Sequence, residues 1–229
     1  MPTRKEYDEE LKAINDLVEA MGQQVLLAID RTTVALKNLD VVAANAIMKN
    51  DAMIDAMETD IEERCIKIVV KQAPIASDWR KLASYMRMIG DLERIADNCS
   101  DIAIYIKKLA RLKKVSVPSH LEEAFSDMRK MVADTVTAFH NIDTDLAENV
   151  VKADDVIDEL FAENIADIKE GIRKDISDLD AYMIYVGINK YVERMADHTT
   201  AVASWVSFIA KGELNIMFTD RYAKGSAEQ

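Results

Sequence analysis

The sequence predicts an all-α protein built as two tandem three-helix bundles, and three observations lead to this fold class. The chain has 229 residues, 49% of them hydrophobic, but only 6 glycines and 3 prolines. Sheets and barrels need a turn about every ten residues, and such turns consume glycine and proline. Apolar residues instead recur three and four positions apart over long stretches, and the second half of the chain repeats the first. The composition therefore disfavours all-β and Rossmann-type folds.

The spacing of apolar residues predicts the first three helices near 4–37, 40–71 and 77–112. The first break falls at Asn38-Leu39, and the second surrounds Pro74, because proline cannot continue a helix. Ser77 is a natural N-cap for the third helix, since its hydroxyl can accept a hydrogen bond from an unpaired backbone N–H. Helices of about 30 residues are about 45 Å long, which is typical of a bundle.

The same spacing predicts the other three helices near 119–140, 143–172 and 177–211. The two halves join around Pro118, a further break falls at Asn141-Ile142, and Ser177 is the expected N-cap of the last helix. The resulting organisation is a first domain at 1–114, a second domain at 115–211 and a loosely ordered tail at 212–229.

The two halves are related as an internal duplication. Residues 77–110, shifted by 100 positions onto 177–210, give nine identities in 34 positions without a gap. Residues 40–57, shifted by 103 positions onto 143–160, keep six identities. The two offsets differ because the loop before the third helix is three residues longer in the first half. Each half is therefore one copy of a three-helix unit.

The charge balance limits the kinds of partner that the chain can bind. There are 29 Lys and Arg residues against 41 Asp and Glu residues, a net charge of −12, which opposes binding to nucleic acids and to anionic membranes. The longest uncharged run, 198–210, has 13 residues, whereas a membrane span needs about 20. The N-terminus lacks the apolar stretch of a signal peptide. We expect a cytoplasmic protein whose cysteines, Cys65 and Cys99, are reduced thiols.

Carboxylates recur at positions that suggest a shared site. Four helical pairs combine an acidic residue with an aspartate four positions later, which places both carboxylates on one helix face. Because the second and third helices of each unit run antiparallel, residues at equal height have numbers that add up to a constant. The pairs of the first unit match at 148, and those of the second unit match at 351. The four pairs are Asp51/Asp55, Glu93/Asp97, Asp154/Asp158 and Glu193/Asp197.

These eight carboxylates predict two metal sites, one in each unit. Four carboxylates at one level repel one another unless they are protonated or neutralised by cations. Oxygen ligands suit Mg or Mn, and bridging carboxylates also suit Fe or Zn. His198 is an additional candidate ligand, although its direction lies about 100° from that of Asp197. The alternatives are a solvated acidic surface and salt bridges to Arg94 and Arg194, which adjoin the pairs.

Two further features admit two interpretations each. Residues 107–114 form the only dense basic stretch, which either complements the C-terminus of the third helix or docks an acidic partner or lipid headgroups. Trp205 and Phe208, near the end of the last helix, belong either to the core or to an interaction surface. The chain has no Walker loop, no GxSxG motif and no Cys/His zinc pattern, which favours a binding protein over an enzyme.

The segments Glu93-Arg94-Ile95-Ala96-Asp97 and Glu193-Arg194-Met195-Ala196-Asp197-His198 resemble the paired motif of the PhoU family. The resemblance extends from the first helix to about Ala210. It implies two tandem three-helix bundles and multinuclear metal clusters held at E/D-x-x-x-D motifs by the same eight carboxylates. The usual continuation of the motif, Asp-His and then Asn-Ile-Ala, is only partly kept, because the first unit has Asn98 where the second has His198.

The resemblance also implies a function. Members of the family are non-enzymatic regulators that dampen phosphate-starvation signalling when phosphate is plentiful. The implied partners are the ATPase subunit of a phosphate ABC transporter and a sensor histidine kinase. We expect the chain to reach the inner membrane face by binding such proteins, without insertion into lipid. We also expect a homodimer. The alternatives are an accessory protein of a low-affinity phosphate permease, a carboxylate-bridged metal-dependent enzyme, and a purely structural helical scaffold.

Overall fold

The computed structural model describes residues 4–72, 74–112 and 116–212, and this part of the chain is helical throughout, without a strand. The predicted all-α fold is confirmed, and every helix end lies within three residues of its predicted position. The predicted tail lies outside the described residues from position 213 onward. The elements in order are α1 (Arg4–Asn38), α2 (Val41–Gln72), α3 (Ala76–Leu109), α4 (Ser119–Asn141), α5 (Thr144–Lys174), the short 3-10 helix η1 (Ile176–Asp178) and α6 (Leu179–Lys211).

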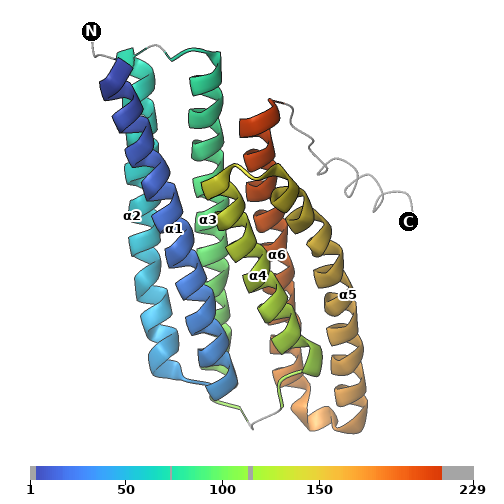
Figure 1. The fold of residues 1–229 in the computed structure, drawn as a ribbon. Helices are drawn as coiled ribbons and strands as arrows, with labels where there is room; N and C mark the ends of the chain where they lie inside the picture. Colours follow the sequence, from blue (N-terminus) through green and yellow to red (C-terminus); the bar gives the residue numbers. More distant parts are fainter. Residues whose placement is uncertain (1–3, 73, 113–115, 213–229) are drawn as a thin grey trace, which may run out of the picture.

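The six helices form two three-helix bundles that lie side by side (Figure 1). We call α1–α3 the first bundle and α4–α6 the second bundle. Helices α2, α3, α6 and α5 follow one another in a row, and α1 and α4 cover one side of that row. The antiparallel pair of α3 and α6 lies at the centre and joins the bundles, and α1 also contacts α4. The residue numbers at which the two domains meet stay a prediction, because residues 113–115 lie outside the described part.

The starts of α3 and α6 differ from the predicted serine caps. The N-cap of α3 is Ile75, which makes no side-chain capping bond, and its carbonyl accepts hydrogen bonds from Asp78 N at 3.0 Å and Trp79 N at 2.9 Å. Ser77 therefore lies inside the first turn. Ser177 lies within η1, where its own N–H donates to Asp175 Oδ1 at 2.9 Å. Both serine-cap predictions were wrong, because the helical turns begin one to two residues earlier than the serines.

The duplication is visible in the backbone of the interhelical loops. Leu39 and Ile142, 103 positions apart, both have a left-handed conformation with φ values of 49° and 51°. In each loop the following aspartate caps the next helix: Asp40 Oδ1 accepts from Val42 N at 2.8 Å, and Asp143 Oδ1 accepts from Leu146 N at 3.0 Å. The predicted breaks at these two loops are therefore confirmed in position and in local structure.

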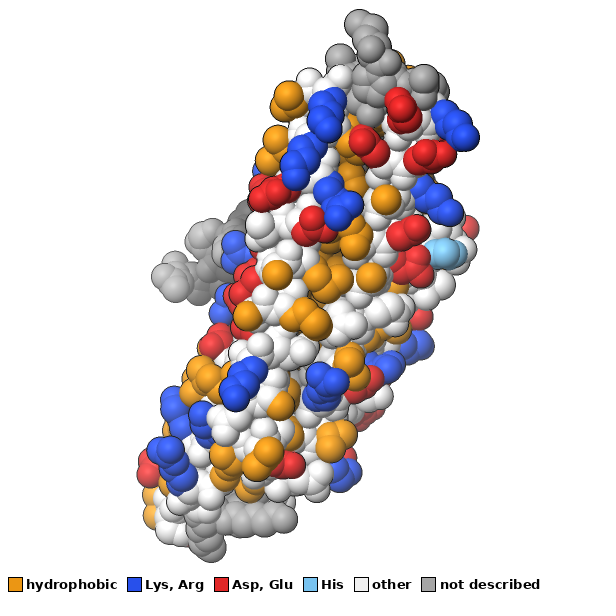
Figure 2. Space-filling model, turned by 90° about the vertical axis from the view of Figure 1, so that its left-hand side faces the viewer, with side chains coloured by type: hydrophobic (Ala, Val, Ile, Leu, Met, Phe, Trp, Pro, Cys, Tyr) orange, Lys and Arg blue, Asp and Glu red, His pale blue; other side chains and the backbone are white. Residues whose placement is uncertain are grey.

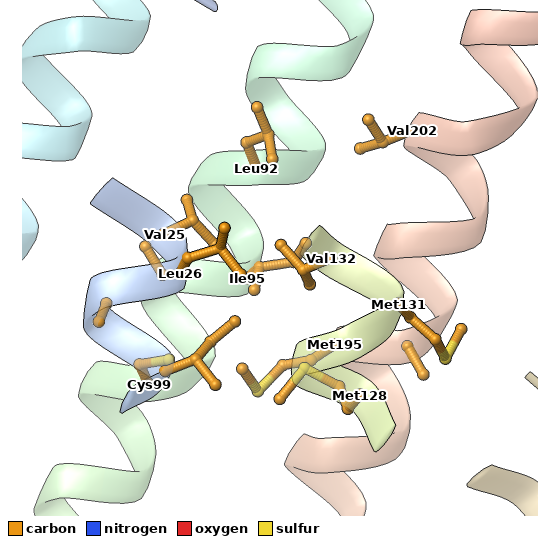
Figure 3. Close-up of a cluster of buried hydrophobic side chains, with 14 of the residues drawn as sticks. Val25, Leu26, Leu92, Ile95, Cys99, Met128, Met131, Val132, Met195 and Val202 are labelled. Carbon is orange, nitrogen blue, oxygen red and sulfur yellow. The ribbon is translucent and has the colours of Figure 1, made fainter. Parts of the chain in front are cut away.

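One hydrophobic core runs through both bundles (Figure 3). Burial raises the pKa of both thiols, those of Cys65 and Cys99, to about 12, so these unbonded cysteines behave as apolar core residues. The bundles thus share a single interior instead of packing as two separate domains. The labelled side chains come from α1 (Val25, Leu26), α3 (Leu92, Ile95, Cys99), α4 (Met128, Met131, Val132) and α6 (Met195, Val202).

The surface over α1 and α2 mixes both signs of charge with scattered hydrophobic side chains (Figure 2). Among the described helices, none is long and apolar enough to cross a lipid bilayer. Of the basic stretch, Lys107 and Lys108 occupy the last turn of α3, where cations favourably oppose the helix dipole, and Lys113 and Lys114 lie outside the described residues. Trp205 packs against the core and contacts Phe208 edge to face, with ring centroids 5.6 Å apart.

Candidate metal site

Three of the four carboxylates predicted for the first unit meet at one level between α2 and α3. One carboxylate oxygen from each of Asp51, Asp55 and Asp97 lies within 4.8 Å of the others. Asp51 and Asp55 flank Ile54, which is buried, and Asp97 follows the buried Ala96. The apolar neighbours fix both helices against the core, and the aspartates between them are left facing the same strip of surface. We call Asp51, Asp55, Glu93 and Asp97 the first carboxylate set.

Burial and mutual repulsion make the first carboxylate set reluctant to ionise. Burial raises the pKa of Asp51 and of Asp97, and the charge of Asp55 raises both further. Glu93 completes the set: burial and the charges of Asp97, Glu58 and Asp55 raise its pKa to about 7. Arg94 acts in the opposite direction on Glu93 but is outweighed. A carboxyl group with a pKa near 7 is one that a cation would stabilise in its ionised form.

Two more acidic residues extend the first set, and sequence reasoning missed both. Glu58 lies on α2 beyond Asp55, and burial followed by the charges of Glu62 and Asp55 raises its pKa. Asp101 lies on α3 beyond Asp97, and its charge raises the pKa of Asp51 and of Asp97. Neither residue has an acidic residue at equal height on the neighbouring helix, so matched residue numbers do not reveal them. Glu58 lies opposite Gly90, where an added Cβ would be 3.5 Å from its Oε1, and Asp101 lacks an acidic residue at the matching height.

The second carboxylate set, Asp154, Asp158, Glu193 and Asp197, is arranged differently. Within the described chain, no three of these residues approach as closely as the aspartates of the first set. Asp154 is buried, Asp158 is exposed, and Glu193 and Asp197 are half-buried. Glu193 is engaged by a lysine of its own helix, with Lys190 Nζ 2.6 Å from Oε2. The two sets therefore differ in geometry, and the expectation that the second set also binds metal stays a prediction.

His198, a candidate metal ligand of the second set, instead contacts an aspartate of the first bundle. Its Nδ1 lies 3.0 Å from Asp91 Oδ1 on α3, so the side chain bridges the two bundles. Arg194, the alternative partner for the second set, lies over the ring of Tyr191 at 5.8 Å from its centroid. His198 thus points across to α3, whereas Arg194 lies against a residue of its own helix.

The ligand atoms of the first set are of the type that divalent cations bind. All its ligand atoms are carboxylate oxygens, the type that Mg²⁺, Mn²⁺ and Ca²⁺ prefer and that bridges iron or zinc ions in clusters. Oxygens of Asp51, Asp55 and Asp97 are close enough to share one ion. The charge of Arg94 offsets only part of the repulsion at Glu93 and Asp97. The second set lacks this fit, since a lysine ammonium occupies one of its carboxylates.

A family model described as the PhoU domain matches the chain twice, at residues 18–106 and 121–206. The chain belongs to the PhoU family. The two matches coincide with the two bundles, and the resemblance of the paired motifs is thereby confirmed.

Relatives and solved structures agree along nearly the whole chain. A phosphate-specific transport system accessory protein PhoU homolog from Aquifex aeolicus is 31% identical over 206 residues, which cover 90% of this chain and 93% of the relative. A homolog with the same description from a Burkholderia species is 28% identical over 210 residues, covering 90% and 89%. The crystal structure of PhoU from Pseudomonas aeruginosa matches with a TM-score of 0.86 and 26% identity, covering 90% of this chain and 100% of that one.

A second PhoU structure, described as the phosphate transport system regulatory protein from Streptococcus pneumoniae, matches with a TM-score of 0.83 and 26% identity, covering 91% of this chain and 98% of that one. The two relatives are described as accessory proteins, and the Streptococcus pneumoniae structure is described as a regulatory protein. The expectation of a non-enzymatic protein is confirmed by this membership.

Proposed function

We propose that this PhoU-family protein regulates phosphate uptake and the phosphate-starvation response as a cytoplasmic adaptor. In this role it connects the ATPase subunit of a phosphate ABC transporter with a sensor histidine kinase when phosphate is plentiful. The observation that supports the role most strongly is the match of both bundles to the PhoU domain, together with relatives named as accessory proteins of phosphate-specific transport.

The architecture suits an adaptor that binds two proteins at once. The two bundles share one core, which favours a fixed position of a partner bound at one end relative to a partner at the other. The net charge of −12 disfavours direct adsorption to anionic lipid, and recruitment to the inner membrane face then depends on proteins. Lys107 and Lys108, at the end of α3, offer a local positive region to an acidic surface of a partner. We expect the adaptor to be a homodimer, which light scattering would detect.

Metal binding is the second part of the proposal. The first carboxylate set holds a divalent cation, or a small cluster of Fe, Zn, Mn or Mg ions, and the cation neutralises the repulsion that raises the pKa of Glu93 and Asp97. Since a bound ion ties α2 to α3, loading the site stiffens the face of the first bundle. The expected consequence is that partner binding depends on the metal.

The regulatory role is tested in a strain that lacks the gene and carries a reporter of phosphate starvation. With ample phosphate, loss of the gene should switch the reporter on, and the wild-type gene should restore repression. Purified ATPase subunit and the cytoplasmic part of the kinase should each bind the immobilised chain. If the deletion leaves the reporter silent and neither protein binds, the role is refuted. Selective capture of a low-affinity phosphate permease would support the alternative accessory role.

The contribution of the basic region is tested by Lys107→Glu/Lys108→Glu. Charge reversal should weaken partner binding, and the loss should grow smaller as the salt concentration rises, because exposed charges are screened over about 10 Å at 0.1 M salt. Lys67→Glu/Lys71→Glu, on the last turns of α2, is the matched control. Equal binding by both variants and the wild type would exclude the end of α3 as the docking region.

A further inference from the structure

The two carboxylate sets differ at positions that the duplication makes equivalent. The offset of 103 relates Glu58 of α2 to Phe161 of α5, and the offset of 100 relates Gly90 of α3 to Lys190 of α6. At these positions the second set has an aromatic ring where the first has an acidic residue, and a lysine where the first has a glycine. Asp101 likewise corresponds to Ala201, which is buried.

The two new residues of the second set act together. Lys190 Nζ donates a hydrogen bond to Glu193 Oε2 at 2.6 Å and lies 5.8 Å from the centroid of the Phe161 ring. The ammonium is thus held between an oxygen of α6 and a π-face of α5, and both contacts favour a cation. The Glu193 side chain is only 19% exposed, whereas that of Lys190 is 55% exposed. The exposed lysine therefore covers the largely buried carboxylate of Glu193.

The same location in the first set provides no internal cation. Gly90 leaves room beside Glu58, and the charge of Glu58 adds to the repulsion that raises the pKa of Glu93. Six carboxylates therefore share the first site, if Glu58 and Asp101 are included, while four carboxylates and one ammonium share the second. An exposed ion pair adds little to folding stability. The main effect of Lys190 is therefore to lower the negative charge of the second set and the number of oxygen atoms that a metal could bind.

We propose that Lys190 and Phe161 close the second carboxylate set to divalent cations, so that the tethered ammonium takes the place of a metal ion there and the chain holds metal at the first set alone. Lys190 acts in two ways. It occupies an oxygen lone pair of Glu193 that a metal would need, and it cancels part of the negative charge that would attract one. Phe161 removes the oxygen donor that Glu58 supplies in the first set. The inference rests on the proposed metal site of the first set.

The test uses the full chain, washed free of metal with chelator, and Mn²⁺ as the probe, with free Mn²⁺ measured by electron paramagnetic resonance. Asp55→Asn/Asp97→Asn removes the first set and provides the background. In that background, Phe161→Glu/Lys190→Gln gives the second set the donors of the first and should bind Mn²⁺ roughly 10- to 100-fold more tightly than the background protein. Lys190→Gln alone, at an exposed helix position, keeps the fold and should tighten binding by roughly tenfold.

Lys211→Gln is the matched control, because Lys211 also pairs with a glutamate, with Nζ 2.7 Å from Glu148 Oε1, but this pair joins α6 to α5 and includes no residue of the second set. It should leave Mn²⁺ binding unchanged. The inference is overturned if neither Lys190 variant gains Mn²⁺ binding, or if the background protein binds Mn²⁺ and Asp158→Asn abolishes that binding. A wild-type chain that binds no Mn²⁺ would refute the proposed metal site of the first set. If the Phe161→Glu/Lys190→Gln variant nevertheless binds Mn²⁺, the closure of the second set by Lys190 and Phe161 still holds.

Discussion

Single residues decide how the acidic strip between α2 and α3 behaves. Asp51, Asp55 and Asp97 bring carboxylate oxygens to within 4.8 Å of one another, and Glu93 shares their repulsion. The matched residue numbers predicted these four from the sequence, because helix geometry alone sets the height of each residue. The same rule could not find Glu58 or Asp101, and it could not foresee that Lys190 folds onto Glu193, since a lysine side chain has many rotamers.

Glu93 gives a prediction for the pH dependence of stability. Its pKa rises from an ordinary value of 4.5 to about 7 in the folded chain, so between these values the native state keeps a proton that the unfolded state has released. The free energy of unfolding of the metal-free chain therefore falls as the pH rises through this interval. Glu93→Gln places an uncharged side chain at this position and so avoids that fall in the free energy of unfolding. The variant should be more stable than the wild type by roughly 1 kcal/mol at about pH 8, after allowance for solvent screening.

Urea denaturation of the metal-free proteins measures this difference, which should shrink as the pH falls toward 4.5. Glu159→Gln, an exposed position of α5, is the control and should track the wild type at every pH. A Glu93→Gln variant that is no more stable than the wild type above neutral pH would show that Glu93 ionises freely.

At the scale of the elements, the sequence predicted the helices well because their signals are local. Apolar spacing located six helices, and Pro74 and Pro118 marked two of the breaks. The capping residues before α3 and η1 were missed, since Ile75 and Asp175 begin the helical turns ahead of the serines. Leu39 and Ile142 were assigned correctly to breaks, but nothing in these residue types suggests a left-handed conformation, which glycine or asparagine usually adopts.

Ile142 therefore offers a test of the loop structure. A residue with a β-carbon in the left-handed region costs about 1–2 kcal/mol, and substitution by glycine removes this cost. The greater flexibility of glycine in the unfolded chain takes back about 0.5–1 kcal/mol of that gain. Ile142 is 37% exposed, so its removal also loses some apolar burial, which offsets the rest of the gain. Ile142→Gly should therefore leave the free energy of unfolding within about 0.5 kcal/mol of the wild-type value.

Thermal denaturation provides the comparison with Val156→Gly, an exposed position in the middle of α5. That control should lose about 1 kcal/mol, as glycine does inside a helix. The proposed backbone conformation at Ile142 is incorrect if both glycine variants destabilise the chain by the same amount.

The whole molecule behaves as one body because the bundles share an interior. Gly22 of α1 lies against Val136 of α4, where an added Cβ would be 2.6 Å from Cγ2, so the helices approach closely. Tyr85 of α3 contacts Phe139 of α4 edge to face, with ring centroids 5.6 Å apart. The sequence showed the duplication, but it could not show that the two units merge their cores, because both separate and fused bundles need the same apolar stripes.

The shared core predicts a single cooperative unfolding transition. Met195 of α6 is fully buried among residues of both bundles (Figure 3), and Met195→Ala should cost about 2–5 kcal/mol. Trp79 lies in the first bundle and Trp205 in the second, so Trp79→Phe and Trp205→Phe each leave one fluorescent reporter. Met195→Ala should shift the urea midpoint equally in both backgrounds, whereas a shift confined to the Trp205 reporter would mean that the bundles unfold independently.

We propose a divalent-cation site at the first carboxylate set and none at the second. Anomalous scattering from crystals of the wild-type chain grown with Mn²⁺ tests it most directly, because it locates the ion without any substitution. We expect an anomalous peak between α2 and α3, about 2.0–2.6 Å from carboxylate oxygens of Asp51, Asp55 and Asp97, and no peak beside Lys190. A chain without a peak at the first set, or with its strongest peak between α5 and α6, would contradict it.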